Sequence, residues 1–181
     1  MRKIHTYRQA ISLLFCLVAL LLLAGCPYES SVPLGPATDA KIDGSLLGRW
    51  KYEDKKSKAT GFLTMSRFNN SELLIVVEEE GKKVPDMMRA FATNVGGENF
   101  LNVQEIKGPY GDRAWMFVKY RTGDCSLTYG VVNDSLVPGG GDKSKRLTSG
   151  RLSDLIKKNL GNKKVFDEET TLTCVKTEGT K

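Results

Sequence analysis

Histidine and cysteine are the side chains that most often act as nucleophiles, general bases or metal ligands, and this 181-residue chain has few of them. Its one histidine is His5, and its four cysteines are Cys16, Cys26, Cys125 and Cys174. The chemistry open to the protein therefore depends on which of these five residues remain in the mature chain.

The first 26 residues have the three parts of an export signal. Arg2, Lys3 and Arg8 form a basic start without a nearby acid, and the apolar run over residues 11–23 is interrupted only at Ser12. A basic start, an apolar core and a small-residue cleavage site are typical of a removable secretory signal. The apolar run is also shorter than the roughly 20 residues that a membrane span needs.

The signal ends in Leu23, Ala24, Gly25 and Cys26, which resemble the lipobox of bacterial lipoproteins. In that family the peptide is cut before the cysteine, whose thiol carries a diacylglyceryl group and whose new amino group is often acylated, as with palmitate. The resemblance implies that residues 1–25 are a signal peptide and that Cys26 is the lipidated first residue. The alternatives are an ordinary signal with a chance cysteine, or an uncleaved anchor.

Such a lipid would make a membrane the first partner of the protein. Each buried CH₂ contributes about 0.8 kcal/mol and a single chain anchors weakly, so three chains would hold the protein permanently. The residue after the cysteine is Pro27. In enteric lipoproteins an Asp there favours retention in the inner membrane. We therefore expect a cell-envelope location, on the outer membrane facing the periplasm in a Gram-negative source.

Removal of the signal changes the charge and the available chemistry. Three of the 27 basic residues leave with it, so 24 remain against 21 acidic ones, a net charge of +3 rather than +6. This mild, mixed charge in an exported protein predicts no nucleic-acid partner. Loss of His5 excludes Ser-His-Asp and Cys-His nucleophiles and histidine-ligated metals. With no D-x-D-x-D-G calcium loop in the sequence, we expect neither a metal nor a cofactor.

Cys125 and Cys174 are the two cysteines left once Cys16 is removed and Cys26 is lipidated. An even pair in an oxidising compartment favours a disulfide. The bond would close a loop of roughly 50 residues, worth about 4 kcal/mol in the chain-entropy model. Two buried free thiols, or one reactive cysteine, are the alternatives.

The mature chain divides into a spacer and one domain. Residues 26–42 contain Pro27, Pro33 and Pro36 and show no apolar period, which is typical of a flexible tether behind a lipidated cysteine. An ordered segment packed on the domain is the alternative. Residues 43–178 have the length of one ordinary domain.

The domain reads as a series of short strands separated by turn residues. A helix with apolar positions at Leu152, Leu155, Ile156 and Leu160 follows the seventh strand, and residues 170–176 form an eighth. Short connections without long crossovers predict an all-β fold, an eight-stranded antiparallel up-and-down barrel with one C-terminal helix before the last strand. The first seven strands are expected over residues 48–53, 60–68, 72–79, 87–95, 99–106, 113–121 and 125–132.

Residues 43–52, DGSLLGRWKY, resemble the first-strand pattern of the lipocalin and wider calycin group, in which a turn precedes Gly-x-Trp. Gly48 and Trp50 match this motif. The resemblance implies that Trp50 closes the barrel floor beneath a basic side chain from a late strand, for which Arg121 is the candidate. The alternative is a glycine in a tight turn and a tryptophan in an ordinary core.

A barrel of eight strands can hold one small ligand or be filled by its own side chains. By analogy with the resemblance, we expect a lipid-anchored protein that binds a small apolar molecule. Methionines suit an adaptable apolar cavity, although packing in a solid core is the more common role for them. The candidates are Met65, Met87, Met88 and Met116.

The alternative function is that of a structural or protein-interaction lipoprotein of the cell envelope, without a cavity. Its contact surface would be the loop over residues 139–146 and the basic face formed by Lys157, Lys158, Lys163 and Lys164. An exposed apolar patch would favour this class.

We expect no enzymatic activity. The run Glu78-Glu79-Glu80 places at most two carboxylates on one face of a strand, because neighbouring side chains alternate. A glycosidase would need two carboxylates across a cleft.

Replacing Cys26 by alanine tests the anchor. We expect Cys26→Ala to remove the acyl chains, and with them the membrane association that they provide. Intact-mass measurement and fractionation of the envelope check this, with Cys16→Ala as the control that should keep both mass and location. An unchanged membrane fraction for Cys26→Ala would contradict the lipid anchor.

Overall fold

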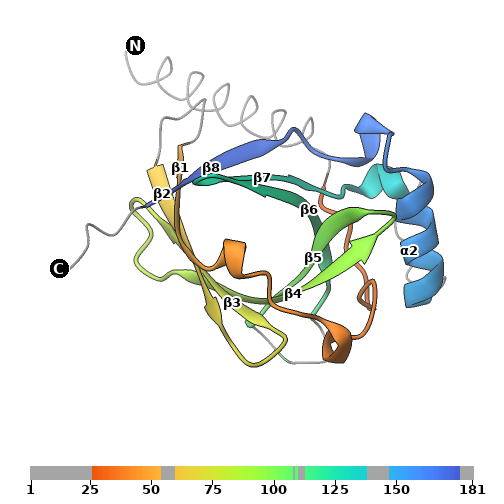
Figure 1. The fold of residues 1–181 in the computed structure, drawn as a ribbon, viewed down its shortest axis with the longest axis horizontal. Coiled ribbons are helices and arrows are strands. Elements are labelled where there is room, and N and C mark those ends of the chain that lie inside the picture. Colours follow the sequence, from red (N-terminus) through yellow and green to blue (C-terminus); the bar gives the residue numbers. More distant parts are fainter. Residues whose placement is uncertain (1–25, 54–59, 108, 110–112, 138–146, 176–181) are drawn as a thin grey trace, which may run out of the picture.

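Eight antiparallel strands form one sheet that closes on itself (Figure 1). The structure is a computed structural model that describes residues 26–53, 60–107, 109, 113–137 and 147–175. Each strand pairs with the next, and the last pairs with the first. The strands are β1 (Gly48–Glu53), β2 (Thr60–Arg67), β3 (Leu73–Glu79), β4 (Asp86–Val95), β5 (Glu98–Glu105), β6 (Met116–Gly123), β7 (Ser126–Val131) and β8 (Thr170–Cys174).

The predicted fold class is therefore confirmed, including the single helix before the last strand. Helix α2 (Ser149–Lys158) begins after Thr148, whose hydroxyl accepts a hydrogen bond from the Arg151 amide. The sixth strand starts three residues later than expected, because Trp115 pairs with Ser30 instead. The short 3₁₀ helices are η1 (Ala37–Asp39), η2 (Gly44–Leu46), η4 (Asp134–Leu136) and η5 (Lys163–Val165).

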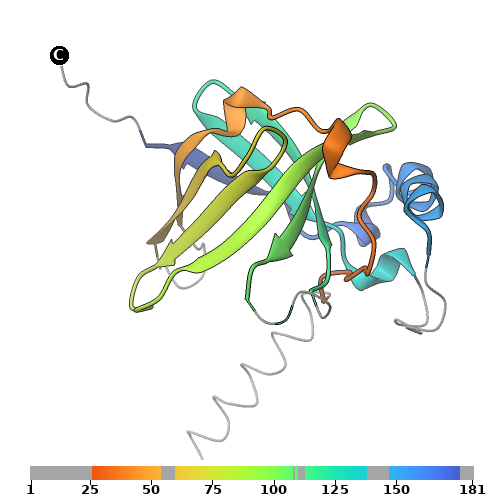
Figure 2. The ribbon, with the colours of Figure 1, turned by 90° about the horizontal axis from the view of Figure 1, so that it is seen from below.

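The two ends of the barrel differ. At the end that we call the closed end lie η2 and the β2–β3, β4–β5 and β6–β7 turns. At the opposite, open end lie the β1–β2, β3–β4 and β5–β6 connections. Figure 2 separates the two: η2 lies at one end, and the β3–β4 hairpin lies at the other, together with the red beginning of the described chain.

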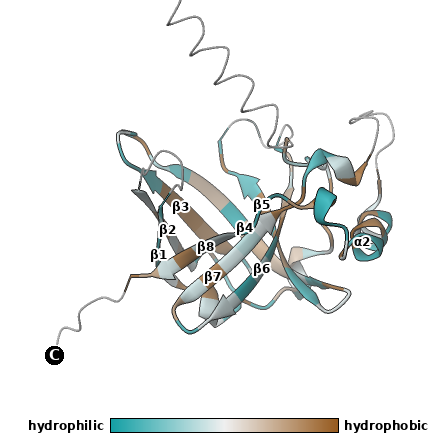
Figure 3. Ribbon diagram, turned by 90° about the horizontal axis from the view of Figure 1, so that it is seen from above, coloured by the Kyte–Doolittle hydropathy of each residue, from teal (hydrophilic) through white to brown (hydrophobic). Residues whose placement is uncertain are grey.

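Alternation along the strands creates two apolar layers. Hydrophobic and hydrophilic positions follow one another along the strands in Figure 3. One layer lines the barrel interior and includes Trp50, Met65 and Leu101. The other lies outside β4–β6 and joins residues such as Phe91 to Ile156 of α2. The barrel is therefore apolar on both sides of this wall.

Residues 26–42 are not a free spacer, so this expectation was wrong for them. They cross the outside of the barrel from the open end to the closed end (Figure 2). Leu34 is buried there, and its amide donates to the Asn102 side-chain oxygen at 2.7 Å. Tyr28 packs against Phe117, with ring centroids 6.2 Å apart. An extended, proline-containing segment can cover the apolar outer surface of the barrel without forming a helix or strand of its own.

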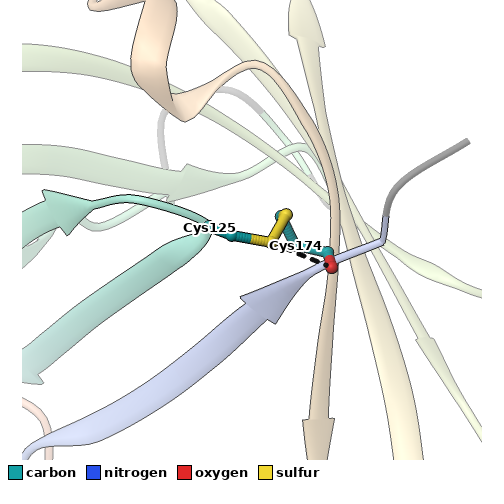
Figure 4. Close-up of a disulfide and its surroundings, with 2 residues drawn as sticks. All are labelled: Cys125 and Cys174. Atoms are coloured by element: carbon teal, nitrogen blue, oxygen red, sulfur yellow. Dashed lines mark hydrogen bonds between the residues drawn. A yellow bond between two sulfur atoms is a disulfide. The ribbon is translucent and has the colours of Figure 1, made fainter.

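The disulfide between Cys125 and Cys174 is confirmed (Figure 4). It joins the β6–β7 turn to the end of β8, and the Cys174 amide also donates to the Cys125 carbonyl at 3.1 Å. Cys125 has a φ of 68°, which is uncommon for a residue with a side chain. The bond thus holds a turn in place next to the barrel seam.

Removing this bond should weaken the fold. The double variant Cys125→Ser/Cys174→Ser is expected to lose about 4 kcal/mol of unfolding free energy, because the denatured chain regains the freedom of a loop of about 50 residues. Urea unfolding of the mature Cys26→Ala protein, with and without the two serines, measures the loss. A difference below about 1 kcal/mol would contradict a stabilising role.

Candidate ligand-binding cavity

The barrel interior encloses a cavity of about 360 Å³. This volume is near the lower limit of small-molecule sites, which is about 300 Å³. Side chains from all eight strands line it, and most of them are apolar. They include Leu63, Met65, Ile75, Val77, Met88, Leu101, Val103, Met116, Val118, Leu127, Val131 and Leu172.

The closed end is sealed by η2 and the start of β1. Leu46 is fully buried, Trp50 is 4% exposed, and the Trp50 indole N–H donates to the Leu46 carbonyl at 3.0 Å. Gly48 has a φ of +135°, and a Cβ there would meet no atom within 4 Å. Glycine is therefore required by the backbone conformation rather than by crowding. The Gly48-x-Trp50 motif thus turns the chain from η2 into the barrel wall.

Arg121, expected to pack over Trp50, lies elsewhere. Its guanidinium points outward and forms two hydrogen bonds with Glu169, at 2.8 and 3.0 Å. The inward residue is its neighbour Tyr120, which lines the cavity. The expectation was wrong by one position, and a shift of one residue moves a side chain to the opposite face of a strand.

Tyr120 ties the closed end to the wall. Its hydroxyl donates to the Asp43 carboxylate at 3.2 Å, and Asp43 also accepts from the Ser45 amide at the start of η2. Burial, followed by the negative charge of Asp43, raises the pKa of Tyr120. The neutral phenol is therefore the form that fits this site.

Polar groups line the open end of the cavity. Tyr52, Glu79 and Tyr129 lie there, at the ends of β1, β3 and β7. Burial raises the pKa of Tyr52, and the charge of Glu79 adds to the effect. Burial also raises the pKa of Tyr129, which hydrogen-bonds Thr170. The mouth therefore offers phenolic donors beside one carboxylate.

The position of Tyr52 depends on a glycine in the neighbouring strand. Gly61 pairs with Tyr52, and a Cβ on Gly61 would lie 2.2 Å from the tyrosine ring. The ring thus covers the space that a side chain on β2 would fill, as aromatic residues do over glycines in sheets. Neither this pair nor the polar mouth was anticipated, since both depend on strand pairing.

Three of the four predicted methionines lie in the cavity wall, namely Met65, Met88 and Met116. Met87 does not: it is 46% exposed on the outer face, as alternation with Met88 requires.

Other predicted residues lie away from the cavity. Lys157, Lys158, Lys163 and Lys164 are exposed in and after α2 on the outside of the barrel. Residues 139–146, together with Leu23, Ala24 and Gly25, lie outside the described residues. Within the described ranges, no group of three acidic or cysteine side chains is placed to hold a metal ion. No helix there is long and apolar enough to cross a membrane.

Comparison with family models, curated proteins and solved structures finds no match to this chain.

The pKa of Tyr120 leads to a test at high pH. A folded-state pKa above the unfolded value of about 10 stabilises the fold below pH 10, and this stabilisation is lost as the pH rises toward the folded pKa. Tyr120→Phe removes the bond to Asp43 and should cost roughly 1–2 kcal/mol at pH 7. It should also lose less stability above pH 10 than the wild type does. Urea unfolding of both proteins at pH 7 and above pH 10 measures the free energies of unfolding. The same pH dependence in Tyr120→Phe and the wild type would contradict the prediction.

Proposed function

We propose that this protein is a lipid-anchored lipoprotein of the cell envelope that binds a small apolar molecule, such as a fatty acid or a lipid chain, inside its barrel. The observation that supports it is the apolar cavity of about 360 Å³ within a wall of eight strands. The cysteine at the lipobox and the disulfide are consistent with an exported, tethered protein.

The cavity suits a ligand with an apolar body and a polar end. Its inner part is lined by side chains such as Ile75, Leu101 and Leu172. Its mouth carries the phenols of Tyr52 and Tyr129, which can donate hydrogen bonds to a head group. The ligand would therefore enter with its apolar end first.

Hydrocarbon burial would provide most of the affinity. At about 0.8 kcal/mol per CH₂, about ten buried methylenes contribute about 8 kcal/mol. This exceeds the lower estimates, about 4 kcal/mol, for the freedom lost on association. The alkyl chain, rather than a charged pair, would therefore be the main source of affinity.

Native mass spectrometry provides the direct test. The mature Cys26→Ala protein, purified from its own envelope, should carry a stoichiometric small molecule that organic solvent releases and mass spectrometry identifies. A clean apo mass, with no gain after fatty acids are added, would contradict the proposal and favour the alternative of a structural or protein-interaction lipoprotein.

A pair of variants on β3 locates the binding site. Val77 lines the cavity, whereas its neighbour Val76 lies on the opposite face of the strand. Val77→Phe should fill part of the cavity and weaken binding of a fluorescent fatty acid by about tenfold or more, at the known cost of overpacking. Val76→Phe, the matched control, should bind as the wild type does. Equal affinity in the two variants would place the ligand elsewhere.

A further inference from the structure

The residue predicted to carry the lipid lies at the mouth of the cavity. Pro27, the next residue, lines the cavity and pairs with Asn133, two positions after the end of β7. The Cys26 carbonyl accepts a hydrogen bond from the Asp134 amide at 2.9 Å. Cys26 itself is exposed. The anchor point is thus built into the rim of the open end.

The chain that follows Cys26 is hydrogen-bonded to the barrel from its first residues onward. The Tyr28 amide donates to the Val132 carbonyl at 2.9 Å, and the Ser30 amide donates to Trp115 at the same distance. The buried bond between Leu34 and Asn102 holds the segment further along the wall. A lipid on Cys26 would therefore be joined to the mouth directly, without a flexible spacer between them.

The rim of the open end also carries groups that suit a membrane surface. The β3–β4 hairpin exposes Val84 and Met87, at 64% and 46%. Lys82, in this hairpin, and Lys107, after β5, both form ion pairs with Asp86. Exposed apolar side chains among such paired charges suit the interfacial region of a bilayer.

We propose that the lipid on Cys26 holds the barrel with its open end against the bilayer, so that the cavity opens onto lipid. The partner of this surface is the membrane that holds the anchor. The inference builds on the proposed function, because it identifies that membrane as the source of the apolar ligand.

Two exposed positions at opposite ends of the barrel test the orientation. Val84 lies in the hairpin at the open end, and Phe68 follows β2 at the closed end, with exposures of 64% and 53%. Each is replaced by cysteine in the lipidated protein, whose other thiols are acylated or joined in the disulfide. The new thiol is labelled with a fluorophore, and the protein is placed in phosphatidylglycerol-containing vesicles with head-group spin-labelled phospholipid. Intact mass confirms the lipid on Cys26.

The label on Val84→Cys should be quenched by about twofold or more relative to the label on Phe68→Cys, because only the open end would meet the interface. Equal quenching, or stronger quenching at residue 68, would overturn the proposal. A mature protein without lipid on Cys26 would overturn it as well.

A spacer variant shows whether the anchor sets this orientation. About 16 Gly/Ser residues inserted between Cys26 and Pro27 give a tether with an average span of roughly 22 Å. Quenching at residue 84 should then fall toward the value at residue 68, and unchanged quenching would overturn the role of the anchor. No ligand is needed for either measurement. An apo mass in the native experiment would therefore refute ligand binding without changing the orientation result.

Discussion

The pairing of β8 with β1 is the constraint on which the rest of the structure depends. It consists of two residue pairs, Trp50 with Cys174 and Lys51 with Thr173. Just beyond it, the Val175 amide donates to the Arg49 carbonyl at 2.7 Å, and the disulfide joins Cys174 to the turn before β7. Without this short seam, two strand edges would be open to solvent and to other chains. The cavity would also lose one side of its wall.

The barrel wall carries apolar side chains on both faces, and this explains where the helix α2 and the amino-terminal segment lie. The inner face forms the cavity and its sealed end. The outer face over β4–β6 must also be covered, and α2 covers part of it with Leu152 and Ile156. The amino-terminal segment covers more, through Tyr28 and Leu34. The path of this segment follows from the hydrophobic effect, because it removes apolar wall from water.

The same path connects Cys26 to the two ends of the cavity. The segment runs from the open end, where Pro27 borders the cavity, to the closed end, where η2 seals the barrel. Polar groups, the cavity mouth and Cys26 therefore gather at one end, and the packed η2 seal lies at the other. Such a division separates the polar mouth of the cavity from the part that maintains the barrel.

The local sequence pattern was sufficient to predict the secondary-structure elements, because side-chain periodicity and turn residues act within a few positions of the chain. It predicted eight strands and the helix before the last of them, whereas the pairing of Cys125 with Cys174 followed from the cysteine count and the expected oxidising compartment. Tertiary structure alone decided which of two neighbouring residues faces inward, as with Tyr120 rather than Arg121, and Met88 rather than Met87. It also decided that the proline-containing segment packs on the wall, since Leu34 finds its partner, Asn102, 68 residues further along the chain. Those outcomes depend on closure and on contacts distant in sequence, which no local pattern contains.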